Sequence, residues 1–135
     1  MSEPSSSELP RQKLDHLRTA LLRLHKAIID SERVEYEKTF GSIPSPNRFL
    51  QLLLQDPWFA WLKPLSELIV KIDETLDSKE SVSVGAAQML SDSTHLLLKP
   101  SENEPGFGQH YFAALQSEPD IVLAHAEVLK VLRGK

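Results

Sequence analysis

A long amphipathic pattern near the N-terminus is the feature that most constrains how this chain can fold. Leucine and isoleucine recur at steps of three and four residues, at Leu14, Leu17, Leu21, Leu24 and Ile28. This spacing places one apolar stripe on a single face of an α-helix. We expect the helix to begin at residue 9 or 10 and to run to Phe40, with Gly41 as its stop signal. A helix of that length spans a small domain, so the other elements must pack along it.

A second stripe on the same predicted helix mixes apolar and polar side chains. Its members are Leu22, His25, Ile29, Glu32 and Tyr36. The two stripes together predict a wide inward face on this helix. Because the second stripe becomes polar after Ile29, the pattern does not sustain the heptads of a long coiled coil.

Three later helices share one start signal, in which a side chain that can cap the first turn is followed by proline. The signals are Ser45-Pro46, Asp56-Pro57 and the segment 117–119. The side-chain oxygen accepts from free N–H groups of the first turn, and proline at the first helical position loses nothing by lacking an N–H. These signals predict helices over residues 46–55, 57–76 and about 119–132. In the first of them we expect the apolar residues to be buried, namely Phe49, Leu50, Leu53 and Leu54.

The predicted helix over residues 57–76 contains Pro64, which removes one backbone hydrogen bond and clashes with the preceding turn. We therefore expect either a kink between Ala60 and Pro64 or two helices that abut there. A kink would also leave a carbonyl near Ala60 without its intrahelical partner.

Two further helices complete the prediction, over residues 84–98 and 107–116, and no segment alternates with the period of a strand. In the helix over 84–98 we expect five side chains to face inward: Ala86, Met89, Leu90, Leu96 and Leu97. In the last helix we expect Ile121, Val122, Val128, Leu129 and Leu132 to be buried. The predicted fold class is all-α, an antiparallel bundle of four principal helices plus one or two short helices, with a kink at Pro64.

Length and composition are those of one globular domain. We expect residues 1–8 to be a short disordered leader without a secretory signal, and residues 9–135 to form a single helical-bundle domain. No apolar run approaches the roughly 18 residues of a membrane span. The chain has no cysteine, which excludes disulfides and thiolate chemistry and is compatible with a cytoplasmic location. The net charge of −4 disfavours nucleic acid and anionic membranes as partners.

The inward histidines are the sharpest candidates for chemistry. His25 and His125 lie on apolar stripes, and Glu32 lies two turns beyond His25 on the same side. Imidazole and carboxylate groups from facing helices are the ingredients of a site for a divalent metal or iron in a helical bundle. Asp92 and His95 resemble one half of the acid-x-x-His pattern of carboxylate-bridged di-iron bundles, in which the pair occurs twice with Glu as the acid.

Each of these residues has a simpler structural interpretation. A lone inward histidine is most often a core residue whose ring nitrogens hydrogen-bond to nearby groups. The spacing of Trp58 and Trp61 predicts that they face the core, although they could also line a pocket for an apolar ligand. Phe59 lies about 100° round the helix from Trp58. It either packs under the helix over residues 46–55 or belongs to an exposed apolar patch that marks an interface.

The sequence shows no glycine-rich phosphate loop, no nucleophile elbow and no basic stripe with interleaved aromatics. This favours a non-enzymatic, intracellular protein-interaction or regulatory module that binds a partner protein or forms a homodimer. Its surface would lie around Phe59 and Pro64, or on the long first helix. The alternative is a small metal- or cofactor-binding bundle that uses His25, Glu32 and His125.

Overall fold

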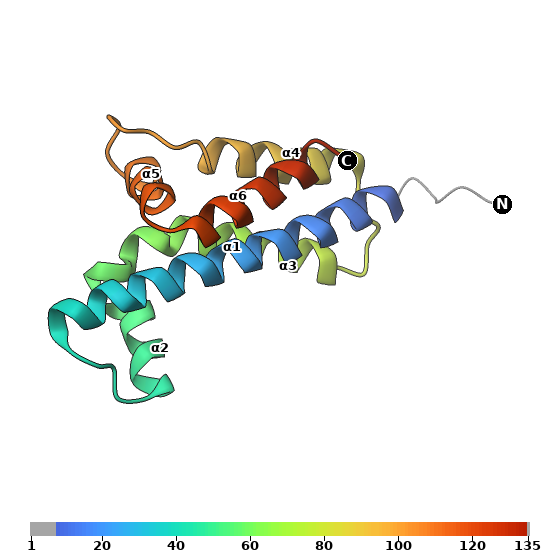
Figure 1. Cartoon of the computed structure of the whole chain (residues 1–135). Coiled ribbons are helices and arrows are strands. Elements are labelled where there is room, and N and C mark those ends of the chain that lie inside the picture. Colours follow the sequence, from blue (N-terminus) through green and yellow to red (C-terminus); the bar gives the residue numbers. More distant parts are fainter. Residues whose placement is uncertain (1–7, 135) are drawn as a thin grey trace.

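The computed structural model describes residues 8–134, and within them all regular secondary structure is helical. The elements are α1 (Glu8–Phe40), α2 (Pro46–Gln55), the 3-10 helix η1 (Pro57–Leu62), α3 (Lys63–Asp77), α4 (Val84–Leu97), α5 (Phe107–Ser117) and α6 (Pro119–Leu132). In Figure 1 the four principal helices, α1, α3, α4 and α6, lie lengthwise, and each runs antiparallel to the next. The predicted all-α antiparallel bundle is confirmed. None of the helices between residues 8 and 134 combines the length and apolar character needed to cross a membrane.

The bundle is built along α1, as its main apolar stripe predicts. All five members of that stripe are fully buried, at 0% exposure: Leu14, Leu17, Leu21, Leu24 and Ile28. The helices α6, α3 and α4 pack against α1. The predicted leader over residues 1–8 lies outside the described residues, except for Glu8, which is already helical.

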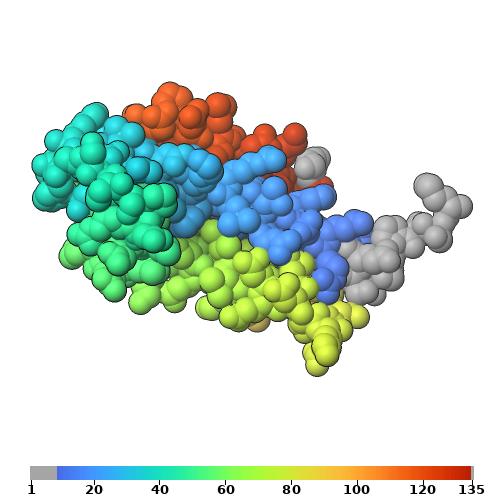
Figure 2. All heavy atoms as spheres, turned by 90° about the horizontal axis from the view of Figure 1, so that it is seen from below, coloured from blue at the N-terminus to red at the C-terminus, as the bar shows by residue number. Residues whose placement is uncertain are grey.

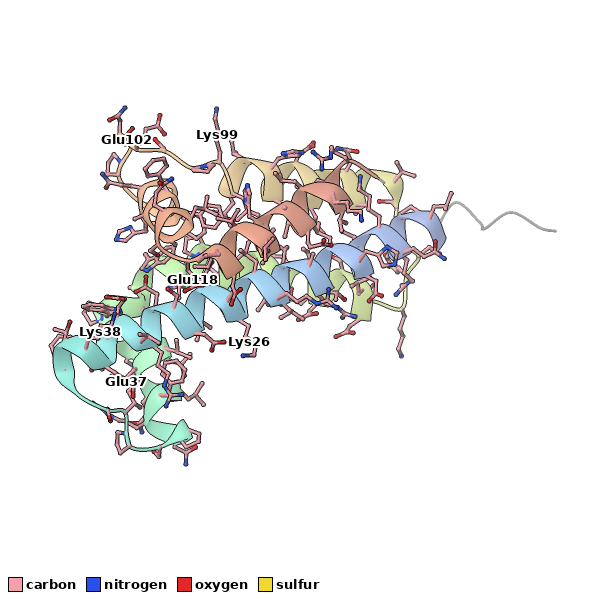
Figure 3. The ribbon with its side chains drawn as sticks, viewed as in Figure 1. Lys26, Glu37, Lys38, Lys99, Glu102 and Glu118 are labelled. Atoms are coloured by element: carbon pink, nitrogen blue, oxygen red, sulfur yellow. The ribbon has the colours of Figure 1, made fainter. Side chains whose placement is uncertain are left out.

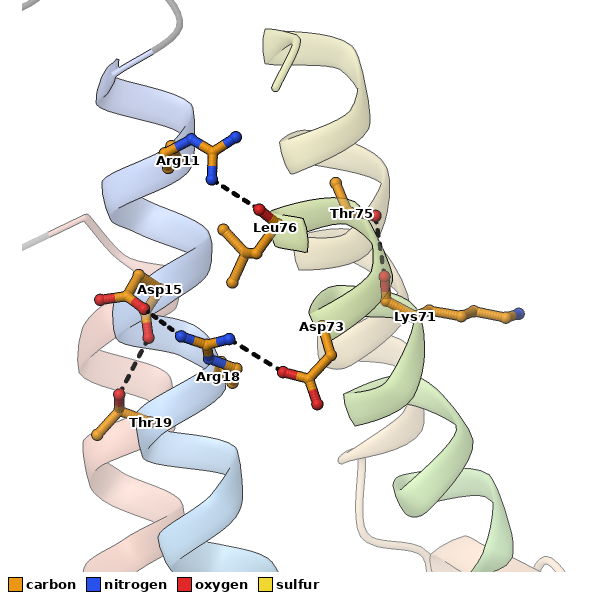
Figure 4. Close-up of polar contacts among 8 residues, drawn as sticks. All are labelled: Arg11, Asp15, Arg18, Thr19, Lys71, Asp73, Thr75 and Leu76. Atoms are coloured by element: carbon orange, nitrogen blue, oxygen red, sulfur yellow. Dashed lines mark hydrogen bonds and ion pairs between the residues drawn. The ribbon is translucent and has the colours of Figure 1, made fainter. Parts of the chain in front are cut away.

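Polar contacts fix the antiparallel register of α1 and α3 (Figure 4). The guanidinium of Arg11 donates to the carbonyl of Leu76 at 2.8 Å. The guanidinium of Arg18 lies 3.1 Å from the carboxylate of Asp73 and 2.7 Å from that of Asp15. These contacts connect the two helices at the end of the bundle that is far from α2 (Figure 1).

All three predicted capping signals form the expected hydrogen bonds. The Ser45 hydroxyl accepts from the Arg48 N–H at 3.1 Å, and the Asp56 carboxylate accepts from the Trp58 N–H at 2.8 Å. The carboxylate of Glu118 accepts from the Asp120 N–H at 3.4 Å. These bonds satisfy N–H groups that a helix start otherwise leaves free.

Of the two alternatives predicted at Pro64, the structure shows two helices that abut. The chain passes from η1 directly into α3, and Pro64 lies in the first turn of α3, where proline is tolerated. The carbonyl of Ala60 is not free, because it accepts from the Lys63 N–H.

The predicted inward face of α4 is correct for Leu90, which is buried, and for Leu97, which packs against the core, but it is wrong for Met89 and Leu96. Met89 is 68% exposed and Leu96 is 78% exposed, and the helix buries a neighbouring face that carries Ala87, Leu90, Ser91 and Thr94. The Ser91 and Thr94 hydroxyls each donate to a carbonyl four residues earlier, at 2.9 and 2.8 Å, so burial leaves neither unpaired. Small side chains with locally satisfied hydroxyls therefore pack inward, and two large apolar side chains remain outside. On α6, Val122 is likewise exposed instead of buried.

Candidate functional site

A groove with mainly apolar walls lies where α2 meets the bundle, on the face shown in Figure 2. It encloses about 500 Å³. Four elements, α1, α2, η1 and α3, together with the cap residue Asp56, provide its lining, which consists of His25, Ile29, Leu50, Leu53, Leu54, Gln55, Asp56, Phe59, Ala60, Leu62, Lys63 and Ser66. A volume of this size falls within the range of small-molecule sites and of pockets that receive a partner's side chains.

The wall contributed by α2 is unusual, because it places leucines in contact with solvent. Leu50 is 54% exposed and Leu54 is 75% exposed, whereas the sequence predicted that both would be buried. The main neighbour of α2 among the described residues is η1. A ten-residue helix with one covering element cannot bury apolar side chains on several faces, and Leu50 and Leu54 therefore stay outside.

His25 and Ser66 meet inside the groove. Their Nε2 and Oγ atoms lie 3.1 Å apart, which links α1 to α3. Burial lowers the pKa of His25, so the ring is neutral near pH 7. A serine hydroxyl beside a neutral histidine provides two of the three groups of a nucleophilic site, the nucleophile and its general base. Within residues 8–134, however, no carboxylate hydrogen-bonds to His25, so the group that would orient the base is missing.

Phe59 does not form part of an exposed patch, which corrects one of the two sequence alternatives. It is 1% exposed and packs under α2, with its ring centroid 5.9 Å from that of Phe49 and 5.5 Å from that of Tyr36. Trp58 packs edge-on against Tyr36 at 5.8 Å. The aromatic cluster of Tyr36, Phe49, Trp58 and Phe59 thus joins α1, α2 and η1. Pro64 is exposed beside Lys63 but does not line the groove.

Trp61 anchors a second cluster, which holds α5 against η1. Its ring is stacked on His110 at 5.2 Å and tilted against Phe107 at 5.4 Å. Both tryptophans are partly buried, and neither lines the groove. The predicted apolar pocket between Trp58 and Trp61 is therefore not the groove found in the structure.

Glu32 is a partly buried carboxylate on the side of α1 that faces Trp58. Burial raises the pKa of Glu32 and nearby Glu35 adds to the rise, whereas Trp58 and the imidazole of His110 oppose it. The Trp58 Nε1–H is itself buried and has no acceptor with hydrogen-bond geometry among the described residues. Glu32 is thus held in surroundings that favour its neutral form more than water does.

The three predicted metal ligands do not assemble. His25 pairs with Ser66, and the Nδ1 of His125 lies 2.5 Å from the hydroxyl of Tyr111. Burial raises the pKa of Tyr111 and lowers that of His125, so both groups are neutral near pH 7. Nowhere in residues 8–134 do three His, Asp or Glu side chains form a group that could hold a metal ion. The convergence of His25, Glu32 and His125 that a metal site would require is therefore not observed.

The acid-x-x-His pair on α4 is not part of a larger site either. Asp92 accepts from the side-chain amide of Gln88 at 2.8 Å, and His95 is exposed. Beyond the end of α4 lies a second hollow of about 580 Å³, lined in part by Leu96, Lys99 and Glu104. Figure 3 shows Lys99 and Glu102 at this connection, on the side of the bundle away from α2. The connecting loop supplies much of its wall, whereas helices form most of the wall of the groove.

Comparisons with protein-family models, with curated proteins and with solved structures find no match for this chain.

Sequence reasoning identified the inward position of His25 but missed the groove as a unit. Ser66 and Lys63 gave no motif that would single them out. One signal was present in α2, where Phe49, Leu50 and the run 52–54 make five of ten residues apolar. That is more than one buried face of a short helix can hold.

Proposed function

We propose that this protein is a non-enzymatic, intracellular protein-interaction or regulatory module, and that the groove receives an apolar segment of a partner protein. The observation that carries the proposal is the exposure of Leu50 and Leu54 at the rim of a preformed apolar groove. Contiguous exposed apolar side chains are characteristic of sites where another molecule covers the surface. A protein segment that extends across the rim would cover more of both leucines than a small ligand inside the groove.

The proposal assigns the protein to the cytoplasm and gives it a protein partner in place of nucleic acid or membrane. The runner-up function, metal or cofactor binding through His25, Glu32 and His125, gains no support from their positions in the structure. A homodimer that uses the same groove is a distinct outcome, and light scattering during size-exclusion chromatography separates it from binding of another protein.

The test is selection of binders from a random peptide display library against the full chain. Leu54→Glu is the groove variant, and Leu96→Glu is its matched control, because Leu54 is 75% exposed and Leu96 is 78% exposed on a different helix. We expect enriched peptides whose affinity falls about tenfold or more with Leu54→Glu and is unchanged with Leu96→Glu. The proposal fails if no enriched peptide loses affinity with Leu54→Glu, or if the only effect of Leu54→Glu is that a dimer of this chain dissociates. Circular dichroism must show that both variants remain folded.

A further inference from the structure

The second stripe of α1 is the part of the groove that indicates the shape of a partner. Its members, Leu22, His25, Ile29, Glu32 and Tyr36, follow one another at steps of three, four, three and four residues. Such a stripe is the surface that one helix presents to another. Near Tyr36 the stripe is covered by Trp58 and Phe59 of η1, with ring separations of 5.8 and 5.5 Å. Toward the N-terminus the cover ends, since His25 and Ile29 line the open groove and Leu22 is 47% exposed.

The apolar surface continues beyond the groove along the line between α1 and α3. The contacts Arg18–Asp73 and His25–Ser66 are seven residues apart on each helix, so they define one antiparallel register. Leu22, four residues after Arg18, is therefore level with the residue next to Val70, which is 50% exposed. Figure 2 views this face, with α2 at one end and α3 beside α1. The apolar track thus runs from α2 past His25 to Leu22 and Val70.

The ion pairs of Arg18 mark where the track ends. The guanidinium contacts Asp15 and Asp73, and both carboxylates are partly exposed (Figure 4). Between Ile29 and Arg18 a helix rises about 16 Å, at about 1.5 Å per residue. A partner helix that covers this distance needs about 11 residues, or about three turns.

The charge at the edge of the groove indicates one polar feature of the partner. Lys63 lines the groove, is exposed and forms no ion pair within residues 8–134. The carboxylate of Asp56, the acidic residue of the lining, instead accepts the hydrogen bond that caps η1. His25 is neutral near pH 7 and adds no charge. A carboxylate on the partner therefore complements Lys63.

We infer that the occupant of the groove is an amphipathic α-helix of about three turns, which lies along α1 from Ile29 to Arg18 and bears an acidic residue opposite Lys63. This inference rests on the proposed function and adds the secondary structure, length and charge of the partner. Leu50 and Leu54 of α2 would cover one side of that helix, and Val70 would contact its far end.

A helix-patterned peptide library tests the inference. The probes are synthetic peptides of about 15 residues with leucines at helical spacing, made in pairs that differ only by Glu or Lys beside the apolar face. We expect the Glu peptide to bind about two- to fivefold more tightly than its Lys counterpart, the range of an exposed ion pair. Lys63→Glu should reverse this preference. Lys71→Glu is the matched control, because Lys71 is an exposed lysine of α3 that points away from α1 (Figure 4).

A further variant, Val70→Glu, tests the extension along α3. It should weaken binding of the full-length helical peptide but not of a peptide shortened at that end. The inference is overturned if peptides that depend on Leu54 bind in an extended conformation by circular dichroism, or if Lys63→Glu leaves the charge preference unchanged. In both cases the groove still binds a protein segment and the proposed function stands. If no peptide of either library depends on Leu54, the proposed function fails as well.

Discussion

Replacing Phe59 by alanine should remove the residue that holds α2 against the bundle. The side chain is 1% exposed, so nearly its full transfer free energy, about 1.5–3 kcal/mol, would be lost. Its ring pairs with Tyr36 at 5.5 Å and with Phe49 at 5.9 Å. Such pairs contribute about 0.5–1.5 kcal/mol each beyond the buried area. We expect Phe59→Ala to lower the free energy of unfolding by about 3–5 kcal/mol, as core Phe→Ala substitutions do.

The loss should be concentrated in α2, because η1 is its main neighbour among the described residues. Urea unfolding followed by circular dichroism gives the free energy, and hydrogen exchange with mass spectrometry locates the loosened segment. In the variant, the amides of α2 should exchange faster than in the wild type, whereas the exchange rates of the amides of residues 14–28 should be less affected. Leu96→Ala, at a side chain 78% exposed, is the control and should cost less than about 0.5 kcal/mol. A loss below about 1 kcal/mol for Phe59→Ala, or unchanged protection of α2, would refute this reasoning.

Three further substitutions test individual features of the fold. Glu32→Gln should stabilise the protein near pH 7 by up to about 1 kcal/mol, because burial raises the pKa of this carboxyl and solvent screens part of the effect. The gain in stability should vanish as the pH falls below 4.5, the ordinary pKa of this carboxyl, because it is then protonated in the folded and the unfolded chain alike. Urea unfolding at pH 7 and below pH 4.5 measures the gain, and equal gains at the two pH values would contradict the prediction. Tyr111→Phe should lower the free energy of unfolding, measured by urea unfolding, by about 1 kcal/mol, because His125 loses its hydrogen-bond partner at 2.5 Å. An unchanged free energy would mean that this hydrogen bond contributes nothing to stability. Pro64→Ala should change stability by less than about 1 kcal/mol, whereas a clear gain in melting temperature would indicate a proline that disrupts its helix.

The features predicted correctly from the sequence depend on neighbours close along the chain. Ser45, Asp56 and Glu118 cap their helices because an N-cap side chain needs only the N–H groups two or three residues ahead. The stripe from Leu14 to Ile28 is buried because the helical repeat places these large apolar side chains on one face, and only burial of that face removes them from water.

The incorrect predictions concern which of several competing faces becomes covered. On α4 the sequence favoured Met89 and Leu96, yet Ser91 and Thr94 are buried. Their hydroxyls are satisfied within the helix, so a face of small residues can approach α1 and α3 closely. Near Pro64 the sequence left open a kink or two abutting helices, and the short 3-10 segment before Lys63 places the proline in a first turn.

The sequence by itself determined that this chain is all-helical, where most helices begin, and which face of α1 is buried. Those properties follow from hydrogen bonds within a few residues and from the helical repeat of apolar side chains. Only the tertiary structure decided that Phe59 is enclosed, that Leu50 and Leu54 are exposed, and that His25 meets Ser66. Each of these depends on which other helix covers a given face. The groove exists because η1 covers the second stripe of α1 near Tyr36 but does not extend over its members Leu22, His25 and Ile29.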